Sequence, residues 1–137
     1  MTTSNTHPDK LKNVFNLLTE ERYVYFIRYV ADCEEVWLIK DREKFVTLGD
    51  KNEQITIPVF PEKQYADLFL TDRWSNCSVE ALNLNKFMDL LDQLQQYNVK
   101  IAGFPKDDFI AIVVEPEEMK NHLLYELQRY ELPTLPQ

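Results

Sequence analysis

Residues 19–48 read TEERYVYFIRYVADCEEVWLIKDREKFVTL, and this stretch decides the fold. Its first half carries apolar side chains at the i, i+3, i+4, i+7 spacing of one helical face, which predicts a helix over 19–33. These side chains are Tyr23, Phe26, Ile27 and Val30. After a polar break, the continuous apolar run 36–39 is typical of a buried strand, and Trp37 adds a large ring to it. The stretch therefore predicts an amphipathic helix that leads into a strand and seeds the core.

The same patterns predict the remaining elements on both sides of this stretch. The other helices are expected at 8–18, 61–69, 83–97 and 116–130. The strands are expected at 36–39, 45–48, 54–60, 77–81, 99–104 and 109–114. The first three strands are joined by short turns, which favour an antiparallel meander, and Pro105-Lys106-Asp107-Asp108 predicts a hairpin between the last two. Asn83 is a plausible helix cap.

These elements predict an α+β fold in one domain, 1–137. An antiparallel or mixed sheet of five to six strands is expected, with about five helices packed on it. Residues 1–6 and 132–137 are expected to be flexible tails. The residues expected in the core are Phe26, Ile27, Trp37, Leu38, Ile57, Leu91, Ile101, Ile112 and Leu127.

Composition excludes several classes of protein. The 15 basic and 23 acidic residues give a net charge of −8, which repels phosphate backbones and disfavours nucleic-acid binding. The charge indicates either an ordinary soluble surface or an acidic face that meets a basic partner. The polar start of the chain predicts no signal peptide, and no apolar run is long enough to span a membrane. A cytoplasmic protein with reduced thiols is therefore expected.

The residues that usually carry chemistry form no recognisable site. Cys33 and Cys77 have neither zinc-ligand nor redox-motif spacing, and the two glycines are too few for a phosphate-binding loop. His122 is expected at the edge of the last helix's apolar stripe, where its ring is hydrogen-bonded or solvated. Asp107 and Asp108 read as turn residues. We therefore assign no catalytic, cofactor-binding or metal-binding residue, and we expect no cofactor.

Two groups of residues are candidates for binding another protein. The second face of the 19–33 helix carries Arg22, Tyr25, Arg28 and Tyr29, which indicate either a helix buried on two sides or an exposed aromatic–arginine patch. Trp74, in a polar break, is either folded back on the core or an interface anchor. Near the end of the sequence, Leu132 and Leu135 alternate with prolines, which indicates either a frayed end or an extended segment that fills a groove on this chain or on a second copy.

Four segments resemble a known family. They are RYVYFIRYVADCEEVWLIKD, IPVFPEKQYADLF, LNKFMDLLDQL and VKIAGFP. Together they resemble the bacterial domain of unknown function 2750 family over residues 19–127. The matching positions are Arg22, Tyr23, Phe26, Trp37, Pro58, Pro61 and Ala66. The order of segments is also similar, more weakly, to the N-terminal domain of a type III secretion regulator. The family resemblance implies a small cytoplasmic protein and supplies no catalytic residues.

For function, the sequence favours a non-enzymatic protein-binding or regulatory module, with a protein partner or a homo-oligomer and without nucleic acid or membrane. The alternative is a small-ligand-binding domain, or a small enzyme, with a pocket between helix and sheet. A cavity with converging polar groups of shifted pKa would favour the alternative. An apolar surface patch on a filled domain would favour the binding module.

Overall fold

The structure, a computed structural model, describes residues 13–49 and 52–131. Helix α2 (Thr19–Cys33) lies where the apolar spacing predicts it. Leu18 takes the cap position, and its backbone N–H donates to the Glu21 carboxylate over 3.0 Å. Glu34 ends the helix in the left-handed conformation, with its N–H bonded to the carbonyl of Val30. Before α2, a helical turn at 13–15 belongs to the first predicted helix, while the proposed tails 1–6 and 132–137 lie outside the described residues.

The described strands form two sheets. The first is antiparallel, with the order β2-β1-β5, and contains β1 (Glu35–Asp41), β2 (Lys44–Phe45) and β5 (Ser78–Asn83). The second has the order β3-β4-β6-β7 and contains β3 (Leu48–Gly49), β4 (Ile55–Val59), β6 (Lys100–Gly103) and β7 (Ile112–Val114). β4 and β6 are parallel, and the other pairs of this sheet are antiparallel. The α+β prediction, with mixed and antiparallel strands, is confirmed.

The two sheets arise because the chain changes sheet within the predicted 45–48 strand. Its first residues pair with β1, and its last residue begins β3, which pairs with β4. Trp37 and Phe60 join the sheets again through two backbone hydrogen bonds, each 2.9 Å long. The short turns therefore give local antiparallel pairs as expected, but these pairs belong to different sheets.

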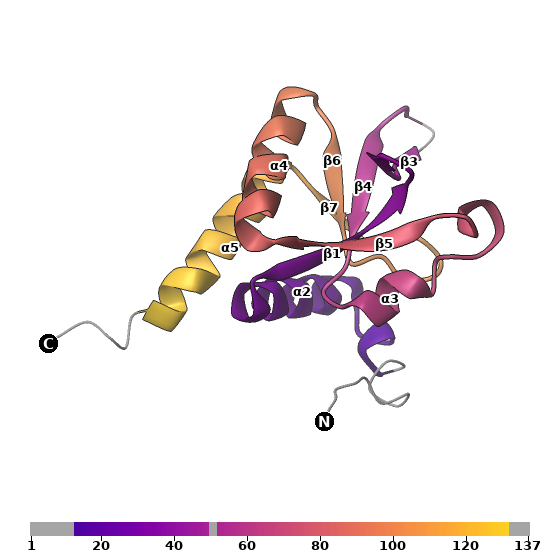
Figure 1. The fold of residues 1–137 in the computed structure, drawn as a ribbon. Coiled ribbons are helices and arrows are strands. Elements are labelled where there is room, and N and C mark those ends of the chain that lie inside the picture. Colours follow the sequence, from indigo (N-terminus) through magenta and orange to yellow (C-terminus); the bar gives the residue numbers. More distant parts are fainter. Residues whose placement is uncertain (1–12, 50–51, 132–137) are drawn as a thin grey trace, which may run out of the picture.

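Helices cover the sheets from two directions (Figure 1). The remaining helices are α3 (Lys63–Asp67), the 3-10 turn η1 (Asp72–Trp74), α4 (Leu84–Gln96) and α5 (Pro116–Glu131). In Figure 1, α2 and α3 lie below β1 and β5, while α4 and α5 lie beside β6 and β7. The Asn83 cap of α4 is confirmed, because its Oδ1 accepts the N–H of Lys86 at 2.9 Å. Among the described residues, no helix combines the length and apolar character needed to cross a membrane.

The core lies between these layers. Six of the nine expected core residues are buried: Phe26, Ile27, Leu38, Ile57, Leu91 and Ile101. The other three, Trp37, Ile112 and Leu127, are half-buried against the same cluster. Trp37 lies at the junction of the sheets, and Ile112 lies on the edge strand β7, so both keep one side open.

Candidate binding cleft

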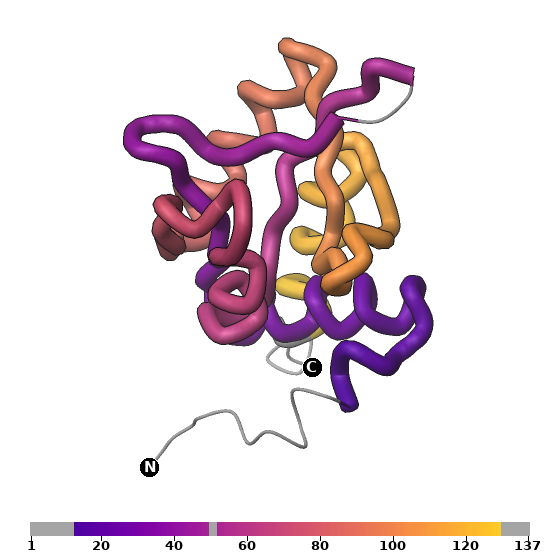
Figure 2. The backbone as a smooth tube through the Cα atoms, turned by 90° about the vertical axis from the view of Figure 1, so that its right-hand side faces the viewer, coloured from indigo at the N-terminus to yellow at the C-terminus, as the bar shows by residue number. Residues whose placement is uncertain are grey.

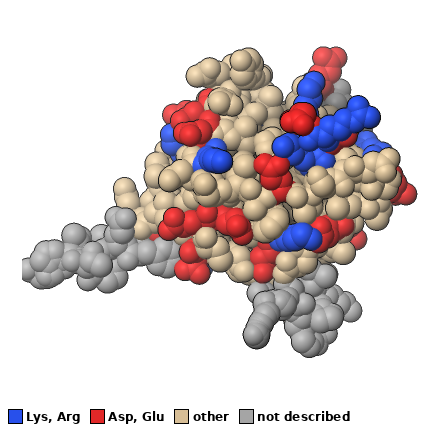
Figure 3. Space-filling model, in the orientation of Figure 1, with Lys and Arg blue, Asp and Glu red and all other residues tan. Residues whose placement is uncertain are grey.

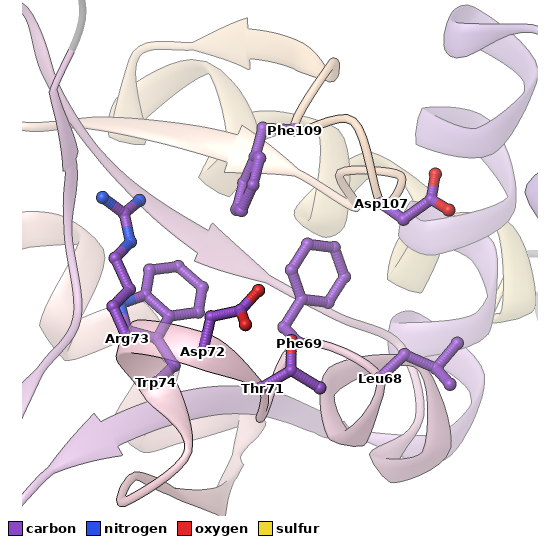
Figure 4. Close-up of a pocket in the computed structure, with 8 residues that line it drawn as sticks. All are labelled: Leu68, Phe69, Thr71, Asp72, Arg73, Trp74, Asp107 and Phe109. Carbon is purple, nitrogen blue, oxygen red and sulfur yellow. The ribbon is translucent and has the colours of Figure 1, made fainter.

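A cleft of about 350 Å³ opens between η1 and the loop that joins β6 to β7. Its lining residues are Leu68, Phe69, Thr71, Asp72, Arg73, Trp74, Asp107 and Phe109. In Figure 4 the rings of Phe69 and Phe109 point toward each other, and the Asp72 carboxylate lies between the Trp74 and Phe69 side chains. Arg73 lies at one end of the cleft and Asp107 at the other. We call this site the Arg73 cleft.

Three aromatic rings form the wall of the Arg73 cleft. The ring of Phe109 meets those of Phe69 and Trp74 edge to face, with centroids 5.4 and 5.8 Å apart. The guanidinium carbon of Arg73 lies 5.3 Å from the Trp74 ring centre and 5.9 Å from that of Phe109, within cation–π range. Trp74 itself is buried, so it is folded back on the core, whereas Phe109 is 44% exposed. The exposed ring at the rim is therefore Phe109.

The backbone is strained where it forms the cleft. Seven described residues other than glycine have positive φ, and they lie at helix ends, in turns and in loops. Three of them are near the cleft: Asp72 (φ 52°), which begins η1, Phe104 (φ 60°), and Phe109 (φ 66°), whose N–H closes a turn on the Lys106 carbonyl. A bulky side chain in this region costs about 1–2 kcal/mol and persists only where its surroundings hold it. Two of these three residues line the Arg73 cleft, and the third starts the loop that carries Phe109.

Arg22 fastens that loop to α2. Only 3% of Arg22 is exposed, and its guanidinium donates to the carbonyls of Phe104 (3.2 Å), Leu17 (3.0 Å) and Ile110 (2.8 Å). Figure 2 shows the orange chain between β6 and β7 coming down onto the indigo helix. Burial lowers the pKa of Arg22, and the negative charge of Asp108 opposes this shift. Arg22 is thus a positioning residue inside the molecule, not part of an exposed patch.

The other residues of the predicted α2 patch lie away from the cleft. The rings of Tyr25 and Tyr29 stack with their centres 5.7 Å apart, and both are half-buried. The Tyr25 hydroxyl donates to Glu62 over 3.5 Å, which partly covers this face. Arg28 is exposed near Glu126. Leu132 and Leu135 lie outside the described residues. Of the predicted candidates that the structure describes, it therefore brings only Trp74 to the Arg73 cleft.

A second concavity, of about 360 Å³, lies between α2 and α5, and we call it the α2–α5 groove. Its lining residues are Tyr23, Val24, Ile27, Arg28, His122, Tyr125 and Glu126. The Tyr23 hydroxyl lies 2.7 Å from His122 Nδ1, so His122 is hydrogen-bonded as expected. Burial raises the pKa of the Tyr23 phenol far above its ordinary value, and the charge of Glu118 adds to the shift. Tyr23 therefore keeps its proton and is a poor general base.

Charge is unevenly spread over the face drawn in Figure 3. Lys and Arg side chains gather at the upper right, near β3, with some acidic groups around them, and a row of Asp and Glu side chains runs along the lower part, near α2. Among the described residues, no three His, Cys, Asp or Glu side chains are grouped so that they could hold a metal ion.

Sequence reasoning missed most of the residues that line the cleft. They are Leu68, Phe69, Thr71, Asp72, Arg73 and Phe109, while Asp107 was expected only as a turn residue. Two signals were present in the sequence. Arg73 directly precedes Trp74 in a polar break. Phe109 directly follows a polar turn, and it does not fit the alternation of apolar and polar residues that a strand shows.

Residues 23–123 match the model of the family described as protein of unknown function, DUF2750. The chain belongs to this family. The matched range contains the Arg73 cleft and most of the α2–α5 groove. No curated protein and no solved structure matches the chain. The weaker likeness to a type III secretion regulator stays a prediction.

Proposed function

We propose that this DUF2750 protein is a non-enzymatic binding module of the bacterial cytoplasm, and that it holds a segment of a partner protein in the Arg73 cleft. One observation carries the proposal: Phe109 is presented to solvent from a strained backbone, beside an arginine that rests on two aromatic rings. The exposed part of this ring and the arginine beside it offer a surface on which a partner side chain could pack.

The composition of the cleft supports a protein partner. Arginine and aromatic side chains are enriched at the centres of protein interfaces, where truncation of one of them weakens binding most. Arg73 is the cation of the cleft lining, and it forms no ion pair with any other described residue. Asp72 and Asp107 supply negative charge elsewhere in the cleft.

These charges define the partner segment. We infer an apolar side chain that packs against Phe69 and Phe109, with an acidic residue on the Arg73 side and a basic residue on the Asp107 side. Opposite charges at the two ends would fix the direction in which the segment binds, because the reversed segment would place like charges together.

The enzymatic alternative is less well supported. The polar groups with the most raised pKa values among the described residues are tyrosines, and burial is the main cause of each shift. Burial of a phenol makes it harder to ionise, which is the wrong direction for a nucleophile or a base at neutral pH. We therefore propose no reaction.

A peptide library displayed on phage and selected on the full-length protein tests the proposed function. Enriched peptides should contain an apolar residue flanked by opposite charges. Phe109→Ala and Arg73→Ala should each weaken their binding at least ~10-fold, as expected for central interface residues. Ile110→Ala is the matched control, since this neighbour is also exposed but does not line the cleft.

The proposal fails if no peptide is enriched, or if enriched peptides bind the Phe109→Ala variant as tightly as the unmodified protein. Thermal melting of each variant shows whether it is folded before its binding is compared.

A further inference from the structure

The α2–α5 groove has an apolar floor that no described residue covers. Ile27 forms its base, and Val24 on α2 is 44% exposed beside the exposed ring of Tyr125 on α5. Polar groups mark both ends, with the Tyr23–His122 hydrogen bond at one end and Arg28 with Glu126 at the other. This arrangement suits a short segment with aliphatic side chains, because its floor offers few hydrogen bonds to a more polar ligand.

The sequence places such a segment next to the groove. Residues 132–137, Leu-Pro-Thr-Leu-Pro-Gln, follow α5 directly and contain two leucines three positions apart. They contain no charged side chain. The two prolines disfavour a helix and favour an extended backbone, so less conformational entropy is lost when the segment is held in a groove.

The geometry allows the segment to reach the groove of its own chain. Tyr125 and Glu126 lie five to six residues before the end of α5 at Glu131. At about 1.5 Å per helical residue, the segment must return roughly 8–9 Å along the helix. Four extended residues span up to about 13 Å, which leaves about 4 Å for the change of direction at the end of α5. Leu135 is thus within reach of Tyr125, which lines the groove together with Val24.

We propose that residues 132–137 fold back into the α2–α5 groove of the same chain, with the Leu135 side chain on Val24 and Ile27 and against the Tyr125 ring. The segment then occupies the groove as an internal ligand and covers the Tyr23–His122 pair. Any external ligand of the groove has to displace it first, which lowers the apparent affinity of that ligand. This proposal is independent of the Arg73 cleft.

Nuclear Overhauser contacts in the full-length protein test the docking. Contacts are expected between the Leu135 methyl groups and both the Val24 methyl groups and the Tyr125 ring. Val24→Lys should remove the contact between Leu135 and the Tyr125 ring, because it puts a charge into the apolar lining of the groove. Leu124→Lys is the matched control and should leave this contact intact, since Leu124 is 41% exposed on α5 but does not line the groove.

A mixture of isotope-labelled and unlabelled protein separates the two possible sources of these contacts. Contacts within one chain support the proposal, whereas contacts between labelled and unlabelled chains would show that a second copy provides the segment and would overturn it. Absence of both kinds of contact would overturn it as well.

Amide hydrogen exchange provides a second measurement. Leu135→Ser should increase the exchange rate of the amides in residues 125–131 several-fold, while Thr134→Ser should not. Equal exchange rates in the two variants would contradict docking.

Discussion

Arg22 and Arg28 lie six residues apart on α2, the first near its N-terminal end and the second in its middle, and their surroundings differ. Arg22 is buried and donates to three backbone carbonyls. The Arg28 side chain is 60% exposed, and its recorded ion pair, with Glu126, spans 3.9 Å. The difference shows that charge alone does not place a residue at the surface. A guanidinium has five N–H donors, so carbonyls arranged around it can replace much of its hydration.

The largest expected effect comes from removing the Arg22 guanidinium. Arg22→Met should lower the free energy of unfolding by about 2–4 kcal/mol. The backbone carbonyls of Leu17, Phe104 and Ile110 would each lose a hydrogen-bond donor. Urea denaturation measures this loss. Arg22→Lys keeps the charge but not the fork of donors, so it should recover only part of the stability. If Arg22→Met lost less stability than Arg28→Met, the proposed difference between the buried and the exposed arginine would be contradicted.

Gly103→Ala should disturb the same end of α2, because Gly103 on β6 lies against the Tyr23 ring. A Cβ atom at Gly103 would lie 2.7 Å from Cδ1 of Tyr23, the residue next to Arg22. The buried Tyr23 ring, held by His122, has little room to move, so a loss of about 1–3 kcal/mol is expected. Gly49→Ala is the control, because nothing lies within 4 Å of its added Cβ. Equal melting temperatures for the two variants would contradict the tight contact.

Asp108→Ala tests how much the loop depends on its own side chains. Asp108 Oδ1 accepts the N–H of Ile110 at 2.9 Å, next to the carbonyl that Arg22 holds. Loss of this hydrogen bond should lower the free energy of unfolding, measured by urea denaturation, by about 1 kcal/mol. Asp108→Asn keeps an acceptor oxygen and should restore most of it. If Asn behaves like Ala, the charge near Arg22 matters more than the hydrogen bond.

Arg28→Met should give the smallest effect. Arg28 is exposed and lies 3.9 Å from the buried Glu126, which Arg129 contacts more closely at 2.9 Å, so the loss should be about 0–1 kcal/mol. Salt should weaken even this contribution, so the difference from the unmodified protein should shrink as sodium chloride is added. A loss comparable to that of Arg22→Met would show that Glu126, buried on α5, depends on Arg28 far more than the distance indicates.

The elements that the sequence predicts well are those whose signal is local. Helices α2, α4 and α5 have apolar side chains at helical spacing, and the Asn83 cap is recognisable from residues 82–87, where Leu82 precedes it and Phe87 follows it in the helix. The division into two sheets was not predictable, because the change of sheet after Phe45 depends on partners far along the chain. The parallel pairing of β4 with β6 is similarly non-local.

The candidate cleft was harder to predict than the fold. Its residues come from two segments that the sequence separates, so neither segment alone has the composition of a site. Phe109 was assigned to a strand because it precedes an apolar run, but its positive φ takes it out of strand geometry. For Arg22 the sequence left two alternatives open, a helix buried on two sides or an exposed patch, because the backbone carbonyls that surround its guanidinium come from distant parts of the chain.

The parallel pair β4–β6 also has a consequence for how the protein is made. On the ribosome, β4 emerges well before β6, since α3, η1, β5 and α4 come between them. The first sheet has all its strands by Asn83, whereas one edge of β4 has no partner until Gly103 has been synthesised. An unpaired apolar strand can pair with another nascent chain. Substitutions that weaken the β4–β6 contact should therefore reduce the soluble yield before they reduce the stability of the finished protein.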